Sequence, residues 1–150
     1  MTAHAHDDLS HRLAAVIDGT RSPGVFRAPS SIDVHALVNE VGPRVGTVWL
    51  IDGPAHTKDE LMEAFAAGCS LPTWFGRNYD ALADCLGDLD VGRRGAILVW
   101  STAGQYRAAA PSQWSMMRSI LEHAVRVHAD AGARLTVICV GGSLPGIDPL

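Results

Sequence analysis

The chain has 150 residues, of which 47% are hydrophobic and 19% are charged, and its formal net charge is −4 at pH 7. This length and composition are typical of a single globular domain. The negative charge disfavours a protein that binds nucleic-acid backbones, because such proteins usually carry an excess of lysine and arginine. No apolar run approaches the roughly 20 residues that a membrane-spanning helix needs. The N-terminal segment lacks the basic start and apolar stretch of a signal peptide, so we expect a cytoplasmic protein that does not bind a membrane.

The three cysteines, Cys69, Cys85 and Cys139, form no C-x-x-C pair. An odd number of cysteines without an export signal is typical of reduced thiols in the cytoplasm rather than of a disulfide framework. We therefore expect three free thiols that act as small buried apolar groups. Three tryptophans that fall in strand or helix stripes are also expected in the core: Trp49, Trp100 and Trp114.

Residues 1–44 are predicted to form an N-terminal helical extension that packs on the core. Residues 7–19 show the pattern of a short amphipathic helix. Residues 22–31 are rich in turn-forming residues, which predicts a connector containing a short apolar piece. A second helix pattern follows, in which Ser30 and Asp33 have the spacing of a capping box.

Residues 45–150 show the clearer pattern of an α/β domain, which is expected to form one structural unit with the extension. Three short apolar runs rich in β-branched residues are typical of strands that are covered on both faces. They span residues 45–52, 95–100 and 134–140. Helix patterns separate these runs, so the strands are expected to pair in parallel through crossover connections. The predicted fold class is α/β, with a three-stranded parallel sheet packed with helices.

The helix patterns of this domain have recognisable starting points. Thr57 and Glu60 have capping-box spacing and start a helix that runs to about Ala67. Asn78 is a plausible cap for the next helix. A longer helix is predicted over roughly residues 112–130, between the second and third strands.

The helix after Asn78 divides into two faces at helical spacing. Its apolar stripe is formed by Leu82, Cys85, Leu86 and Leu89. The opposite stripe carries three aspartates and two small residues: Asp80, Ala83, Asp84, Gly87 and Asp88. Like charges four residues apart each destabilise a helix by about 0.2–0.5 kcal/mol. This face is therefore either ordinary solvated surface or a binding surface whose acids serve a partner.

Two aromatic residues, Trp74 and Phe75, precede this helix on a loop that contains proline and glycine. At least one of the two side chains is expected to be exposed. Ala83 and Gly87 alternate with the acids and leave room for another molecule to approach. An acidic face with an aromatic anchor suits a protein partner rich in arginine and lysine.

The stretch "LPTWFGRNYDALADCLGDL", residues 71–89, resembles the signature of the barstar family, intracellular inhibitors of ribonucleases. The family pattern has a leucine–proline pair, an aromatic pair, a glycine, an asparagine, and the runs Asp-Ala-Leu and Asp-Cys-Leu. The matching positions are Leu71, Pro72, Trp74, Phe75, Gly76, Asn78, Asp80, Ala81, Leu82, Asp84, Cys85 and Leu86. The likeness covers about residues 45–140, and the first 40 or so residues resemble an extension found on longer members.

The resemblance implies a protein that plugs a ribonuclease active site with this helix and the preceding aromatic loop, its acids standing in for substrate phosphates. By this resemblance, Asp84 matches the central acid that enters the enzyme's phosphate-binding cluster. Asp80 matches a supporting acid, and Trp74 matches an aromatic residue that packs on the enzyme's catalytic surface. The expected partner-binding residues are Trp74, Phe75, Gly76, Asn78, Tyr79, Asp80, Ala83, Asp84, Gly87 and Asp88. The expected partner is a basic, extracellular-type ribonuclease bound one-to-one, without direct contact to nucleic acid.

Several positions differ from the best-known member of the family. Ala83 replaces the aromatic residue that this member has between the two acids. Gly87 replaces its hydroxyl residue after the motif, and Leu89 replaces a following aromatic residue. Two acids late in the last long helix are replaced by Val127 and Ala131. These changes leave the target open, so an immunity or regulatory module against another basic toxin nuclease is an alternative.

An enzyme is not predicted, because the histidines fall in no metal or catalytic-triad pattern. His123 and His128 are five positions apart on one predicted helix and so point in different directions.

The glycine pair before Ser143 follows a strand, where ligands often bind in parallel sheets, but such a pair is more often a turn. A nucleic-acid-binding module is the weaker alternative, because Arg93 and Arg94 are outweighed by neighbouring aspartates. We therefore expect no catalytic residue, metal or cofactor.

Overall fold

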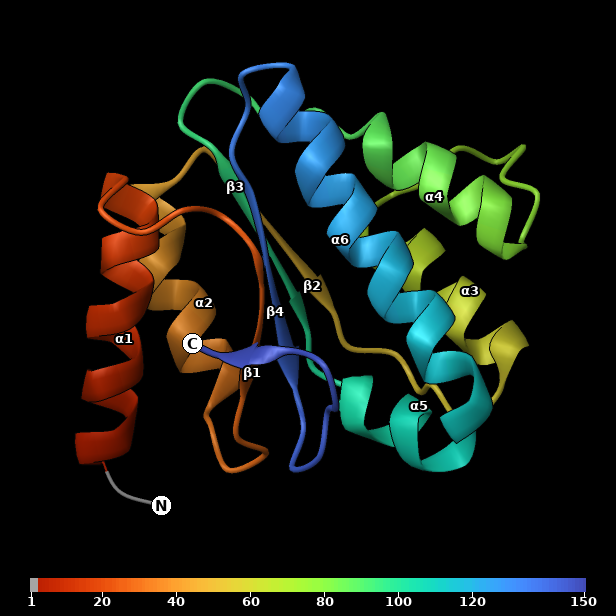
Figure 1. The fold of residues 1–150 in the computed structure, drawn as a ribbon, viewed down its shortest axis with the longest axis horizontal. Helices are drawn as coiled ribbons and strands as arrows, with labels where there is room; N and C mark the ends of the chain where they lie inside the picture. Colours follow the sequence, from red (N-terminus) through yellow and green to blue (C-terminus); the bar gives the residue numbers. More distant parts are fainter. Residues whose placement is uncertain (1–2) are drawn as a thin grey trace.

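A computed structural model describes residues 3–150 and shows a parallel sheet between two layers of helices (Figure 1). The strands lie in the order β2-β3-β4-β1-β5, and every neighbouring pair is parallel. They are β1 (Val25–Ala28), β2 (Thr47–Ile51), β3 (Ala96–Trp100), β4 (Leu135–Val140) and β5 (Asp148–Pro149). The α-helices are α1 (Ala3–Asp18), α2 (Val34–Val41), α3 (Lys58–Gly68), α4 (Tyr79–Gly87), α5 (Ala103–Ala109) and α6 (Trp114–Asp130). No helix in this described part of the chain is both long and apolar enough to cross a membrane.

The strands β2, β3 and β4 confirm the three predicted strands and their parallel pairing. The predicted strand number is wrong, however, because the sheet has five strands. β1 lies in the segment that was expected to be a connector, and β5 near the chain's C-terminus was not predicted. The four residues of β1 become a strand because β4 offers them a partner, with Phe26 in register with Ile138. This pairing depends on a segment more than a hundred positions away, so it leaves little local trace.

Helices α3 to α6 cover one face of the sheet (Figure 1) and enclose the larger core cluster. Aromatic rings lie at its centre. The Trp100 ring centroid is 5.2 Å from that of Phe65 and 6.1 Å from that of Trp114. Trp100 and Trp114 are buried, as predicted. Trp49 is only half-buried, because β2 is the edge strand and has a neighbour on one side alone.

Helices α1 and α2 cover the opposite face of the sheet, where a second core cluster forms. Leu13 of α1 and Leu37 of α2 have no exposed surface, and they belong to the same cluster as Val99 and Ile138 of the sheet. Burial of apolar surface stabilises a protein by about 25 cal/mol per Å². The N-terminal residues therefore shield a sheet face that would otherwise be open to water.

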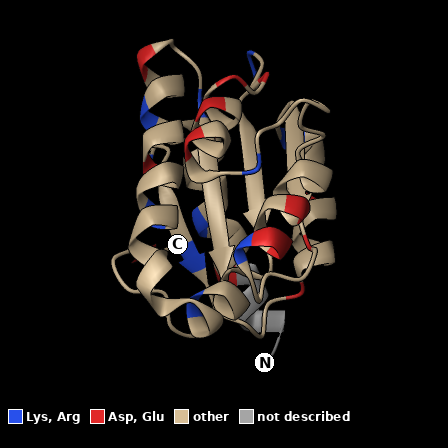
Figure 2. Ribbon diagram, turned by 90° about the vertical axis from the view of Figure 1, so that its right-hand side faces the viewer, with Lys and Arg blue, Asp and Glu red and all other residues tan. Residues whose placement is uncertain are grey.

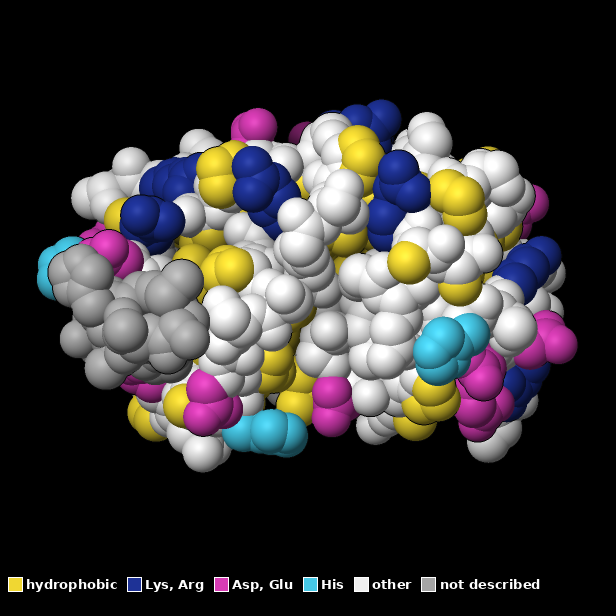
Figure 3. Space-filling view, turned by 90° about the horizontal axis from the view of Figure 1, so that it is seen from below, with side chains coloured by type: hydrophobic (Ala, Val, Ile, Leu, Met, Phe, Trp, Pro, Cys, Tyr) yellow, Lys and Arg dark blue, Asp and Glu magenta, His cyan; other side chains and the backbone are white. Residues whose placement is uncertain are grey.

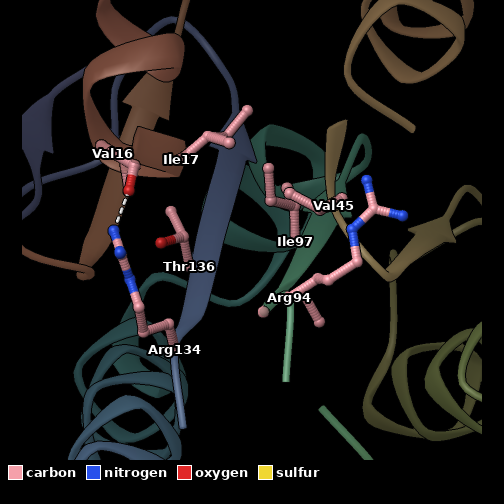
Figure 4. Close-up of a pocket in the computed structure, with 9 residues that line it drawn as sticks. Val16, Ile17, Val45, Arg94, Ile97, Arg134 and Thr136 are labelled. Atoms are coloured by element: carbon pink, nitrogen blue, oxygen red, sulfur yellow. Dashed lines mark hydrogen bonds between the residues drawn. The ribbon is translucent and has the colours of Figure 1, made fainter. Parts of the chain in front are cut away.

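The end of α1 is joined to the start of β4 by Arg134. The Arg134 guanidinium donates a hydrogen bond to the carbonyl of Val16, in the last turn of α1 (Figure 4). A positive charge is favourable there because the helix dipole places partial negative charge at the C-terminal end. The cavity left between Val16, Ile97 and Thr136 measures only about 10 Å³, at the lower limit for one water molecule. The C-terminal end of α1 therefore packs closely against the sheet.

Two helix starts show how far the capping patterns hold. Thr57 caps α3 as predicted and accepts a 3.1 Å hydrogen bond from the backbone N–H of Glu60. The Glu60 carboxylate accepts a 2.8 Å bond from the backbone N–H of His56 rather than from that of Thr57, so only half of the predicted capping box forms. In α2 the cap is Asp33, whose side chain accepts a 3.0 Å bond from a backbone N–H in the first turn. Ser30 was expected to provide that cap and does not, because the helix begins only at Val34.

The remaining helix boundaries also differ from the predicted ones. α1 begins at Ala3 rather than near residue 7. The predicted helix over residues 112–130 begins at Trp114, because Pro111 opens a separate 3-10 turn just before it. α5 was not predicted, since its seven residues carry no capping pattern and too few turns for a clear periodicity.

Candidate protein-binding site

The helix α4 presents an acidic face to solvent because its opposite face is held in the core. Asn78 caps the helix, and its side chain accepts a 2.8 Å hydrogen bond from a backbone N–H in the first turn. The predicted apolar stripe is buried at Leu82, Cys85 and Leu86. Leu89, the fourth member of that stripe, is half-buried because the helix has already ended at Gly87.

The three aspartates of this face, Asp80, Asp84 and Asp88, are all exposed. Among the described residues, no ion pair joins any of them to a basic side chain. Asp80 lies in the first turn, where the helix dipole favours a carboxylate, and Asp88 follows the last turn, where a negative charge is disfavoured by about 0.3–1 kcal/mol. Figure 2 looks onto this side of the molecule and shows acidic segments on the helices nearest the viewer. The face therefore carries negative charge that a basic partner can neutralise.

His128 of α6 fixes the C-terminal part of α4 from inside. Its side chain is buried, and its Nε2 lies 2.9 Å from the carbonyl oxygen of Leu86. Carbonyls in the last turn of a helix run out of partners within the helix, so a side-chain donor there stabilises the end. Sequence reasoning did not assign this role. The available signal was the spacing of His128 within the apolar stripe that also contains Leu121, Ala124 and Val125.

The loop before α4 separates its two aromatic side chains. Trp74 has 76% of its surface exposed, whereas Phe75 has 6% and packs in the larger core cluster. The Phe75 backbone N–H donates a 3.0 Å hydrogen bond to the carbonyl of Pro72, which closes the turn that directs its ring inward. The expectation that at least one aromatic is exposed is confirmed. Phe75 was expected among the partner-binding residues, but its side chain packs in the core beneath the loop and does not lie on the exposed surface.

Arg77 fixes the same loop to α3. Its backbone has a φ of 53°, a left-handed conformation that costs about 1–2 kcal/mol for a residue other than glycine. Its guanidinium forms an ion pair with Glu63 of α3. This pair engages the Arg77 guanidinium with an acid of α3, and no ion pair in the described structure joins it to the aspartates of α4.

Tyr79, the first residue of α4, links this helix to its neighbours. Its hydroxyl is hydrogen-bonded to that of Tyr106 on α5, and the Lys58 ammonium lies 4.9 Å from its ring centroid. Burial raises the pKa of Tyr106, and the hydrogen bond to Tyr79 raises this pKa further. Tyr79 is half-buried, so it positions the start of α4 more than it extends toward solvent.

The two small residues of the outer face, Ala83 and Gly87, carry no long side chain that could project between the aspartates. Ala83 and Gly87 are half-buried, and a Cβ atom at Gly87 would lie 3.6 Å from Val127, an ordinary contact distance. Asn78 is exposed, but its side chain is engaged as the helix cap. The residues that remain open for contact are Trp74, Gly76, Asp80, Asp84 and Asp88, with Ala83 and Gly87 between them.

The thiols contribute no reactive group to this surface. All three cysteines are free and buried, as predicted. Burial raises the pKa of Cys85, and the nearby charges of Asp88 and Asp84 raise it further. Burial alone raises the pKa of Cys69 to about 12. A thiol with a raised pKa stays protonated at neutral pH, so Cys85 acts as an apolar contact of α4.

The glycine pair that the sequence places after a strand, Gly141 and Gly142, follows the C-terminal end of β4. Seen from below, this face carries basic side chains mainly along one margin and acidic and histidine side chains mainly along the other (Figure 3). A Cβ atom on Gly141 would lie 2.9 Å from the Cα atom of Gly104, so this glycine allows α5 to approach the end of β4. Arg27 at the same edge donates a 3.1 Å hydrogen bond to the carbonyl of Ile147. Gly141 is thus explained by packing, and Gly142 lies in a bend. Among residues 8–150, whose side chains the structure describes, no group of three or more metal-ligating side chains comes together.

Comparison with known families bears on the surface around α4. The model of the family described as "Barstar (barnase inhibitor)" matches residues 48–139. The matched segment runs from β2 to β4, covers more than half of the chain, and includes the whole of α4 and the Trp74 loop. No curated protein matches the chain significantly.

Proposed function

Because this chain belongs to the barstar family, we propose that it is an inhibitor that binds a ribonuclease one-to-one. In this proposal α4 and the Trp74 loop cover the active site of a basic, extracellular-type enzyme. The protein would act in the cytoplasm.

The observation that carries the proposal is the row of exposed aspartates without basic partners in the described structure. Asp80, Asp84 and Asp88 recur every fourth residue on one exposed side of α4. A ribonuclease active site must bind phosphates, so it offers arginine and lysine side chains. Hydrogen bonds between such groups and a carboxylate are about twice as strong as bonds between neutral groups. The acids can therefore occupy the positions of substrate phosphates.

The three acids are expected to contribute differently. Asp84 lies in the middle of the row, where a docked partner would exclude water most completely, so its loss should act mainly on the dissociation rate. Asp88 lies at the end of the row, nearer to solvent. Charges at the rim of an interface act mainly on the association rate, and salt screens them. Trp74 adds a large exposed aromatic surface next to the acids, a residue type that is enriched in binding hot spots.

A panel of purified basic ribonucleases tests this proposal. The protein is expected to stop RNA cleavage by at least one of them at a one-to-one ratio and to cleave no RNA itself. Association should slow as ionic strength rises, because attraction between opposed charges guides the encounter. A second arm with basic deoxyribonucleases tests the alternative that the chain neutralises another toxin nuclease. Inhibition in that arm alone would replace the ribonuclease with this other class of target.

A further inference from the structure

A groove of about 370 Å³ lies beside α4, between its C-terminal end and the edge of the sheet. One wall is the loop before α4, and the other is the segment that follows the helix. The residues that line the groove include Trp49, Leu71, Trp74, Asp88, Leu89 and Asp90. Trp74 and Asp88 also belong to the acidic surface of α4, so the groove is continuous with that surface.

The groove is open because β2 is the edge strand of the sheet. Trp49 on β2 is half-buried, in contrast to Trp100 and Trp114. Leu71 and Leu89 are also half-buried, while Trp74 extends into solvent. The groove thus has an apolar lining of two leucines and two indole rings.

The rim of the groove is acidic. Asp88 and Asp90 are both exposed, and no ion pair involves either one within the described residues. Arg94, which follows Asp90 closely in the sequence, does not line the groove, and its guanidinium donates a 2.7 Å hydrogen bond to the carbonyl of Pro43. An apolar lining below two carboxylates suits a side chain with an apolar stem and a cationic head.

We propose that this groove binds an arginine side chain of the nuclease partner, at the margin of the part of that partner that α4 covers. The guanidinium would stack on an indole ring and donate hydrogen bonds to Asp88 and Asp90. Arginine fits better than lysine because its planar head both stacks on aromatic faces and forms paired hydrogen bonds with carboxylates. This inference rests on the proposed function for the identity of the partner, but the binding preference of the groove can be measured without that partner.

The test is a titration of the 150-residue protein with N-acetyl-L-arginine amide, followed by NMR at the indole N–H and leucine methyl groups. We expect saturable shifts at Trp49, Trp74, Leu71 and Leu89, and none of these with the uncharged citrulline analogue. Asp90→Asn should weaken binding by about 2- to 5-fold, the effect of an exposed ion pair. Asp148→Asn removes the same charge at β5, the opposite edge of the sheet, and should leave binding unchanged. Leu89→Arg, which places a guanidinium in the groove itself, should abolish the saturable shifts, with thermal unfolding as the check on its fold.

Three results would overturn the inference: no saturable shift, equal shifts with the citrulline analogue, or binding that Asp90→Asn and Leu89→Arg leave intact. The outcome is separable from that of the proposed function. If arginine binds as expected but Asp84→Ala inhibits the nuclease as well as the parent does, the groove stands and the inhibitory role of α4 fails. If arginine does not bind while Asp84→Ala loses inhibition, the groove inference alone fails.

Discussion

Replacing His128 with leucine should destabilise the protein by releasing the end of α4. The imidazole is buried and lies 2.9 Å from the Leu86 carbonyl. Leaving a buried polar group without its partner costs about 1–3 kcal/mol. The Leu86 carbonyl also accepts from the backbone N–H groups of Leu89, at 3.5 Å, and of Asp88, so it would keep two weaker contacts. We therefore expect about 1–2 kcal/mol for His128→Leu, or roughly 2–8 °C in Tm at 2–4 °C per kcal/mol for a chain of this size.

Thermal and urea unfolding, followed by circular dichroism, measure this change. His123→Leu is the matched control, because His123 lies on the same helix and is exposed. His128→Gln keeps a side-chain N–H donor and should recover part of the lost stability. His128 would have no such role if His128→Leu unfolds at or above the parent temperature, or if His123→Leu loses as much stability.

The remaining predictions concern the core, the thiols and the acidic face. Leu13→Ala in α1 should destabilise the protein by about 2–5 kcal/mol, because Leu13 is fully buried against the sheet. Urea unfolding at parent-like stability would show instead that the extension does not form one unit with the rest. Cys69 has a folded pKa of about 12 against an ordinary value of 9.0, so its contribution to stability is fully present below pH 9 and is lost as pH rises toward 12. Cys69→Ala should therefore flatten the stability profile in that window, and an unchanged alkaline slope would contradict this. Asp84→Ala should leave the unfolding free energy unchanged or raise it by about 0.2–0.5 kcal/mol, because like-charge repulsion is relieved. A loss of more than about 1 kcal/mol in urea would mean that Asp84 has a structural role.

The parts of this molecule that the sequence predicts well are those specified by local pattern. The helix α4 has a capping asparagine, an apolar stripe at helical spacing and a flanking loop, and each of these signals lies within about ten residues. β3 is apolar along its full length because helices cover both of its faces. Such a run is typical of a central parallel strand. The cap of α3 by Thr57 is likewise contained in one helical turn.

The features that were missed depend on distant partners. β1 has four residues and exists as a strand because β4 lies beside it. Trp49 has the pattern of a core residue, but its burial depends on the position of β2 at the sheet edge. Trp74 and Phe75 are adjacent aromatics, and only the turn at Pro72 decides which one is buried. Contacts made in three dimensions decide these cases, so local propensity alone could not predict them.

Inhibition of a cognate ribonuclease by matched aspartate variants tests the central claim most directly. The inhibition constants of the parent, Asp84→Ala and Asp148→Ala are compared at one ionic strength. Truncating a buried, hydrogen-bonded charge at an interface typically costs about 2–5 kcal/mol, so Asp84→Ala should weaken inhibition by roughly 30-fold or more, at 1.4 kcal/mol per tenfold. Asp148→Ala removes the same charge at the far edge of the sheet and should match the parent. If Asp84→Ala inhibits the enzyme as strongly as Asp148→Ala does, the acidic face of α4 is not the inhibitory surface.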